Sequence, residues 1–210
     1  MTAYYECRAP EYDDWYLGRG LFRERKRPGW HEELAAVVLM VGSLGPARTL
    51  DVACGTGFIT RHLPGDVVGL DRSEAMLEAA SSRVPGARVR ADGLSLPFRD
   101  DSFDRLFTGH FYGHLRGRER EPFLRETRRV ASELVVLDAA WRDDVAPEEL
   151  QARVRSDGST HHVYKRYFTA RRLTQEMGGG ETLHEGRWFV VVRSRLLVQT
   201  GRRRVMTDGK

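Results

Sequence analysis

The sequence predicts an α/β protein built on a doubly wound, mostly parallel sheet with helices on both faces. Short apolar runs and segments of helical character alternate five times, as they do when crossover helices join parallel strands. Residues 182–198 alternate around a turn at Glu185-Gly186, which predicts a closing antiparallel hairpin and one reversed strand. A chain of 210 residues suffices for one such domain and is too short for two full-sized ones.

Each element has its own local signal. Nearly continuous apolar runs predict buried parallel strands at residues 48–52, 66–71, 87–91, 103–108 and 134–137. An apolar stripe of helical period followed by Gly45-Pro46 predicts a helix over residues 30–44. Ser73 is a favourable N-cap for a helix that ends at Pro85-Gly86. The remaining helices are expected at residues 58–63, 119–130, 147–155 and 169–177.

The chain is organised around the segment from Asp51 to Gly57. It follows the first expected strand and carries Gly55 and Gly57, so its backbone can approach a ligand closely. Loops at the carboxyl ends of parallel strands are where open α/β sheets bind nucleotides. Twenty positions after Asp51, Asp71 ends the second expected strand, where a carboxylate can accept both hydroxyl protons of a ribose. The pattern therefore predicts an adenosine site.

Two classes of cofactor fit such a loop. A dinucleotide fingerprint, G-x-G-x-x-G, needs a third glycine where this chain has Thr60. The other class holds the amino-acid end of S-adenosylmethionine and binds no pyrophosphate. Residues 51–57 resemble motif I of the class I S-adenosylmethionine-dependent methyltransferases, in particular the type 11-like small-molecule enzymes. Ala53 stands where that family has its first glycine.

The resemblance covers residues 30–198 and implies a Rossmann-like sheet of seven strands with the last pair antiparallel. It places Gly55 and Gly57 beneath the methionine part of the cofactor, Asp71 at the ribose hydroxyls and Asp92 at the adenine amino group. The cofactor-binding residues that it implies follow the ends of successive strands and are Asp51, Ala53, Cys54, Gly55, Gly57, Asp71, Arg72, Met76, Asp92, Gly93, Leu94 and Thr108.

Methyl transfer from a sulfonium needs alignment and, for a protonated acceptor, removal of a proton. His110, which follows the fourth expected strand, is the first candidate for a general base. By resemblance His114 is a structural residue at a helix start. The pair at positions 110 and 114 lacks a third ligand at a telling spacing, so no metal is expected. His161-His162 lies in a segment that is either a substrate-facing loop or a plain surface loop.

Residues 1–30 form an aromatic-rich segment that would expose a large apolar patch if it were a free tail. We expect it to pack as a helical cap and, by resemblance, to act as a lid over the site. The domain organisation is therefore a cap at residues 1–30, a methyltransferase domain at residues 31–200 and a basic tail at residues 201–210 that contains Arg202-Arg203-Arg204.

The composition of the chain narrows its expected cellular compartment and its expected partners. The net charge is +4, but the basic residues, of which only three are lysines, are scattered among acids, which argues against a nucleic-acid partner. No run of about 20 apolar residues is present to span a bilayer, and the acidic, aromatic residues 1–16 lack the basic-then-apolar pattern of a signal peptide, so none is expected. With only Cys7 and Cys54, a disulfide framework is not expected, which favours the cytoplasm. The sequence leaves a monomer or a homodimer open.

Two features that the sequence lacks narrow the class of methyl acceptor. Residues 108–111 lack the Asn/Asp-Pro-Pro-Tyr run of enzymes that methylate polymer amide or amino nitrogens, and no target-recognition domain fits. A small, aromatic or apolar molecule methylated on O, N or C therefore fits best. Three alternatives stay open: an NAD-dependent oxidoreductase, a non-catalytic S-adenosylmethionine-binding module, and an RNA methyltransferase.

Overall fold

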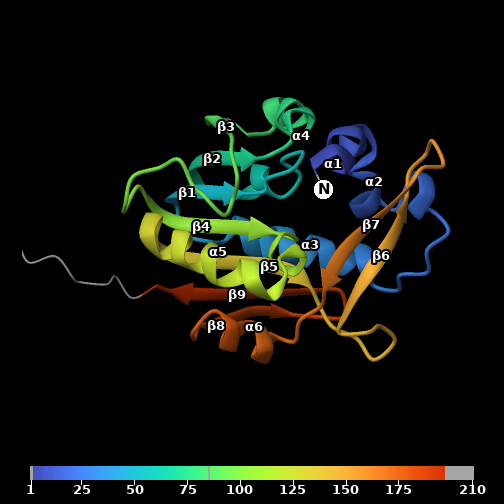
Figure 1. Cartoon of the computed structure of the whole chain (residues 1–210). Coiled ribbons are helices and arrows are strands. Elements are labelled where there is room, and N and C mark those ends of the chain that lie inside the picture. Colours follow the sequence, from blue (N-terminus) through green and yellow to red (C-terminus); the bar gives the residue numbers. More distant parts are fainter. Residues whose placement is uncertain (1, 85, 197–210) are drawn as a thin grey trace, which may run out of the picture.

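The computed structural model describes residues 2–84 and 86–196, and its centre is a twisted seven-stranded sheet (Figure 1). In spatial order its strands are β3 (Arg88–Arg90), β2 (Gly65–Asp71), β1 (Ala47–Val52), β4 (Phe103–Gly109), β5 (Ala131–Ala139), β9 (Phe189–Arg195) and β8 (Glu181–Glu185). The first five run parallel, and β9 runs antiparallel to both of its neighbours. The predicted doubly wound sheet with a reversed last strand is confirmed.

Helices cover both faces of the sheet, and two short ones lie at its carboxyl edge. The helices are α1 (Thr2–Arg8), α2 (Asp14–Leu17), α3 (Trp30–Gly42), α4 (Glu74–Ala79), α5 (Gly117–Val130) and α6 (Ala170–Glu176), of which α1 and α2 lie at the edge (Figure 1). Short 3₁₀ turns occur at Ala9–Glu11, Gly20–Phe22, Thr60–His62, Ala80–Ser82 and Tyr112–His114. As expected, Ser73 caps α4, because its Oγ accepts a hydrogen bond from the Met76 amide at 3.2 Å.

The central strands supply two cores, because successive side chains of a strand point to opposite faces. Leu106 of β4 belongs to the core beneath α5 and α6, while the next residue, Phe107, belongs to the core beneath α3. Leu134 and Val135 of β5 divide in the same way. Strands that are buried on both faces consist mostly of apolar residues, which explains why the sequence predicts them.

The strand order reverses direction at β1, which lies between β2 and β4. The loops after these strands therefore diverge, and the carboxyl edge opens between them. In Figure 1 the arrowheads of β1, β2 and β4 point toward the N-terminal helices α1 and α2, in blue, and toward an orange hairpin on the same side. These two segments lie at the edge where the sequence predicts the ligand.

The hairpin corrects the sequence prediction. Residues 147–155, expected as a helix, contain strand β6 (Glu148–Val154), and His161-His162, expected in a loop, lie in β7 (Thr160–Arg166). The two strands pair from Glu148 opposite Arg166 to Val154 opposite Thr160. Glu, Leu, Gln, Ala and Arg favour helices locally, but this propensity amounts to only a few tenths of a kcal/mol per residue and the ladder overrides it.

One expected helix is shorter in the structure, and the expected tail lies outside the described residues. The helix predicted over residues 58–63 is a single 3₁₀ turn at Thr60–His62, because the chain must enter β2 directly after it. The basic tail at residues 201–210, and the end of the last expected strand at residues 197–198, lie outside the described residues.

Candidate functional site

The loop after β1 turns sharply through left-handed backbone conformations. The φ angles are 60° at Ala53, 55° at Gly55 and 76° at Gly57. Glycine adopts this region freely, whereas an alanine there costs about 1 kcal/mol. The Cys54 amide donates to the Leu70 carbonyl at 3.0 Å, which fixes the loop against β2. The loop thus presents bare backbone at the carboxyl edge of the sheet.

Asp71, at the end of β2, faces this loop. Its Oδ2 accepts a hydrogen bond from the Gly55 amide at 3.0 Å, and its Oδ1 accepts one from the Ser73 amide at 2.9 Å. Burial raises the pKa of the carboxyl above its ordinary value, while these amides act against the shift. Each oxygen keeps a lone pair, so the carboxylate can still accept two hydroxyl protons.

A cavity of about 700 Å³ opens between the loops after β1, β2 and β4. Of the residues predicted from the sequence, seven line it: Ala53, Gly55, Asp71, Arg72, Met76, Gly93 and His110. Tyr5 and Tyr12 of the N-terminal segment and Phe111 after β4 also line it. Its shape and lining fit a nucleoside, with an apolar enclosure for a base and a carboxylate for a ribose.

Six other predicted residues are absent from the cavity lining: Asp51, Cys54, Gly57, Asp92, Leu94 and Thr108. Thr108 donates through Oγ1 to the Val52 carbonyl at 2.7 Å, which joins β4 to β1. Asp92 accepts from the Leu94 amide at 3.0 Å and lies 3.7 Å from the Arg72 guanidinium. These contacts shape the loops that surround the cavity.

Asp51 lies beneath the loop and is almost fully buried. Its Oδ2 accepts a hydrogen bond from Thr60 Oγ1 at 2.6 Å, whereas its Oδ1 has no hydrogen-bond partner within the described residues. Burial raises the pKa of this carboxyl to about 7. Asp51 therefore titrates near neutral pH in the folded protein.

His110 occupies a strained position after β4. Its φ is 59°, and its ring packs 4.9 Å from the Trp15 ring, centroid to centroid. Its Nε2 is buried and finds no hydrogen-bond partner within residues 2–84 and 86–196. Burial, aided by the positive charge of Lys165, lowers the pKa of the imidazole to about 3. The ring is therefore neutral at physiological pH and is a weak base.

A cluster of buried polar side chains lies next to His110. Lys165 of β7 donates a hydrogen bond to Asp138 of β5, and Asp138 also accepts from the Gly113 amide at 2.7 Å. Burial alone would raise the pKa of Asp138, but the charge of Lys165 and its hydrogen bond, together with His110 and His114, hold the pKa below its usual value. His114 donates through Nδ1 to the Tyr164 carbonyl at 2.6 Å. The cluster thereby joins the hairpin to the sheet.

A second cavity, with an empty volume of about 1180 Å³, adjoins the first. Tyr12, His110 and His114 line both cavities. The N-terminal segment, β6–β7 and Trp188 supply most of the remaining wall. The aromatic composition of residues 1–30 indicated such a wall, but nothing indicated the contribution of β6, because that segment was predicted to be helical.

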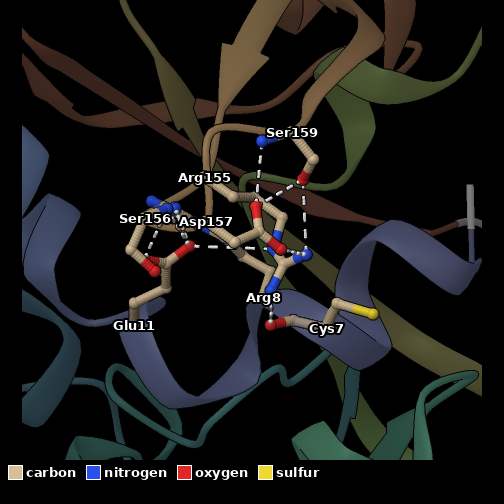
Figure 2. Close-up of polar contacts among 7 residues, drawn as sticks. All are labelled: Cys7, Arg8, Glu11, Arg155, Ser156, Asp157 and Ser159. Carbon is tan, nitrogen blue, oxygen red and sulfur yellow. Dashed lines mark hydrogen bonds and ion pairs between the residues drawn. The ribbon is translucent and has the colours of Figure 1, made fainter.

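The N-terminal segment is fastened on both sides of these cavities. Asp13 accepts from Thr56 Oγ1 at 2.5 Å and pairs with Arg83 at 2.6 Å, which anchors the segment to the glycine loop. On the other side, Glu11 accepts from the Ser156 amide at 3.2 Å, and Arg155 donates to the Cys7 carbonyl at 3.1 Å (Figure 2). The segment therefore closes over the site in this structure.

The central strands of the chain match a known protein family. Residues 50–134 match the model of a family described as a methyltransferase domain. This part of the chain is therefore similar to a methyltransferase domain, in keeping with its resemblance in sequence to the class I S-adenosylmethionine-dependent methyltransferases. The matched residues run from β1 to the middle of β5 and so include the glycine loop, Asp71 and His110.

Curated relatives match the central part of the chain. A demethylmenaquinone methyltransferase of Thermotoga maritima is 35% identical over 118 residues, which cover 52% of this chain and 49% of the relative. A 2-phytyl-1,4-naphtoquinone methyltransferase of Synechococcus elongatus is 38% identical over 96 residues, or 40% of each chain. The chain thus spans about half, or less, of the length of these curated relatives.

Solved structures match nearly the whole fold. A structure described as a DhpI–SAM–HEP complex has a TM-score of 0.72 and 22% identity, and the match covers 91% of this chain and 94% of the other. A Thermotoga maritima protein described as a possible histamine N-methyltransferase has a TM-score of 0.64 and 20% identity, over 93% and 100% of the two chains. At this identity the likeness shows the fold.

Neither a metal site nor a membrane-spanning helix is found in the described residues. In residues 2–84 and 86–196, no three His, Cys, Asp or Glu side chains gather closely enough to hold a metal ion. Within the same ranges, every helix is too short or too polar to cross a membrane.

Proposed function

We propose that this protein binds S-adenosylmethionine in the cavity beside Asp71 and methylates a small, aromatic or apolar molecule bound in the adjoining cavity. The observation that carries the proposal is that the two cavities are adjacent, because Tyr12, His110 and His114 line both of them. Methyl transfer needs donor and acceptor close together and in line, and two adjacent cavities could hold them so. The family's dependence on this cofactor and the quinone methyltransferases among the relatives support it.

The residues of the first cavity fit the cofactor. Asp71 would accept hydrogen bonds from the ribose hydroxyls, with Gly55 leaving room for close approach of the methionine part. Met76 and the Gly93 backbone would border the adenine, and the rings of Tyr5 and Tyr12 would exclude water. When bound, S-adenosylmethionine supplies an activated methyl group on a sulfonium.

At the junction of the cavities, His110 is suited to position the acceptor. Its Nε2 has no protein partner in the described residues, so a polar group of the acceptor can satisfy it. Because its pKa is about 3, the ring is too weak a base to remove a proton efficiently near pH 7. We therefore infer that His110 orients the acceptor and that the acceptor reacts without deprotonation by this residue.

Three other functions were left open by the sequence. A dinucleotide oxidoreductase is disfavoured, since Thr60 stands at the third glycine position and its hydroxyl is held by Asp51. A non-catalytic module that only binds S-adenosylmethionine would need the first cavity and not the second. RNA methylation finds no support in the named relatives. The two free thiols, Cys7 and Cys54, suit the cytoplasm that we propose as its compartment.

Calorimetric titration with S-adenosylhomocysteine tests the cofactor assignment. We expect binding to the unmodified protein and at least a tenfold weaker affinity in Asp71→Asn, because charge-assisted hydrogen bonds to the ribose are lost. Asp66→Asn, at the exposed start of the same strand, is the matched control and should bind normally. Absence of binding, or binding of NADH in its place, would overturn the proposal.

A further inference from the structure

The second cavity has an unbalanced charge. Nineteen residues line it, and none of them is an aspartate or a glutamate. Six of them are cationic: Arg8, Arg25, Arg27, Arg142, Arg153 and Lys165. A cavity that served only an apolar acceptor would not gather these groups, because moving a charge away from water costs free energy unless it is paired.

Three of these cations are neutralised from outside the cavity. Arg8 pairs with Glu11 at 2.7 Å, Arg142 with Asp144 at 3.0 Å, and Lys165 with Asp138. Their positive charge is therefore largely compensated by carboxylates that do not line the cavity.

The other three, Arg25, Arg27 and Arg153, make no ion pair with any residue in the described part of the chain. Arg27 donates only to the Trp15 carbonyl at 2.8 Å, and Arg153 donates to the Gln151 amide oxygen at 3.0 Å. Arg27 and Arg153 are half-buried, and Arg25 is the most exposed of the three. The cavity thus holds three cations whose charge the surrounding protein leaves uncompensated.

Arg25 and Arg27 lie close enough to other guanidinium groups for their charges to repel, whereas Arg153, despite its burial, has a raised pKa because of Tyr5, Tyr4 and Tyr12. Burial, together with the charges of Arg153 and Arg8, lowers the pKa of Arg25. Burial and the charge of Arg25 lower the pKa of Arg27 to about 10. A bound anion would relieve this repulsion, and guanidinium is the side chain best matched to an oxyanion, which it can bind through two parallel hydrogen bonds.

The remaining wall is aromatic. Trp15, Phe22, Trp30 and Trp188 line the same cavity, and the Arg27 guanidinium lies 3.8 Å from the centre of the Trp30 ring. The site therefore combines an apolar enclosure for a carbon skeleton with cations for a charged end. This combination distinguishes an amphipathic acid from both a neutral quinone and a polyanion.

We propose that the methyl acceptor is a small molecule carrying an oxyanion, a carboxylate or a phosphoryl-type group, held by Arg25, Arg27 and Arg153 while its organic part packs on the aromatic wall. This inference rests on the proposed methyltransferase function and specifies its substrate class. Arg25 and Arg27 come from the N-terminal segment and Arg153 from β6, so the anion would also bridge the two segments that close the site (Figure 1).

The test is calorimetric titration of the full chain, saturated with S-adenosylhomocysteine, at low ionic strength. Benzoate and phenylphosphonate are the charged probes; benzamide and dimethyl phenylphosphonate are their neutral counterparts. We expect the charged probes to bind at least tenfold more tightly than the neutral ones, and the order of benzoate and phenylphosphonate identifies the preferred oxyanion.

Arg153→Gln and Arg27→Gln should each weaken the preferred charged probe at least tenfold and leave S-adenosylhomocysteine binding intact. Arg118→Gln, an exposed position on α5, is the matched control and should change neither. Equal affinity for charged and neutral probes, no binding of either charged probe, or unchanged affinity in both cavity variants would overturn the inference. Loss of S-adenosylhomocysteine binding to the unmodified chain would instead refute the methyltransferase function.

Discussion

The protonation of His110 is decided by its surroundings. Its ring is enclosed by Trp15, Tyr16 and Phe189, and the nearest carboxylate oxygen, Asp138 Oδ1, lies 3.9 Å from Nδ1 and is already bound to Lys165. Burial disfavours the imidazolium, and an acid that is already neutralised offers little compensation. The polar contact that His110 offers is therefore a hydrogen bond from a neutral ring.

We expect His110 to remain neutral from pH 8 to pH 5. In a spectrum of protein labelled with ¹³C and ¹⁵N histidine, the signals that disappear in His110→Gln should keep their chemical shifts over this range, because the pKa is about 3. The control is the same protein in denaturant, where every histidine should titrate near its ordinary pKa of about 6.5. A midpoint above pH 5 for His110 in the folded protein would contradict this account.

The sequence predicted the part of the site that a single local segment builds. The sequence predicts the glycine loop and Asp71 because the loop directly follows one short apolar run and Asp71 ends the next, and each run forms a strand. Arg153 and Tyr12 were not assigned to the site, since their positions depend on contacts between segments about 140 residues apart in the chain, such as Glu11 with Ser156. No local pattern encodes such a pairing.

At the scale of elements, one carboxylate holds α3 to the antiparallel edge of the sheet. Glu33 accepts hydrogen bonds from the amides of Trp188 and Phe189, at 3.0 and 2.8 Å, and lies 3.2 Å from His184 Nε2. Trp188 lies in the turn between β8 and β9, and Phe189 is the first residue of β9. Glu33 thus supplies an acceptor to both amides.

Glu33→Ala should therefore lower the free energy of unfolding by about 2–4 kcal/mol, since two partly buried amides lose a charged acceptor. Urea denaturation at pH 7 measures the change. Glu32→Ala, an exposed neighbour on the same helix, should shift stability by less than about 0.5 kcal/mol. Equal effects of the two substitutions would show that the Glu33 contacts contribute nothing.

The β6–β7 hairpin shows why one element was mispredicted. Its first strand consists of good helix formers, yet the turn after it contains Asp157-Gly158, with Gly158 at a φ of 83°, which is a recognised hairpin signal. The turn signal was more informative than the composition of the strand. The strand before the turn was hard to predict from the sequence. Leu150 and Val154 are exposed and the inward-facing side chains are polar, so the usual alternation, with apolar side chains facing inward, is inverted.

At the scale of the whole molecule, sheet order and two-sided burial were predictable, because they follow from alternating apolar runs. The pH dependence of stability could not be predicted, because it arises from the burial of Asp51 and His110 in the folded protein. The folded-state pKa of Asp51 is about 7 against 3.8, so the folded protein holds an extra proton between these values and gains stability as pH falls. For His110 the order is reversed, about 3 against 6.5, so stability is lost as pH falls below 6.5.

Between pH 7 and pH 5 each group contributes about 2 kcal/mol, with opposite sign, so the two nearly cancel. Relative to the unmodified protein, Asp51→Asn should become about 2 kcal/mol less stable over this interval, and His110→Gln about 2 kcal/mol more stable. Urea denaturation at pH 7, 6 and 5 measures both differences, and the double variant should restore the unmodified dependence on pH. Parallel stability curves for the two single variants would refute the opposing shifts, because only groups that bind protons differently in the folded and unfolded states can change the slope.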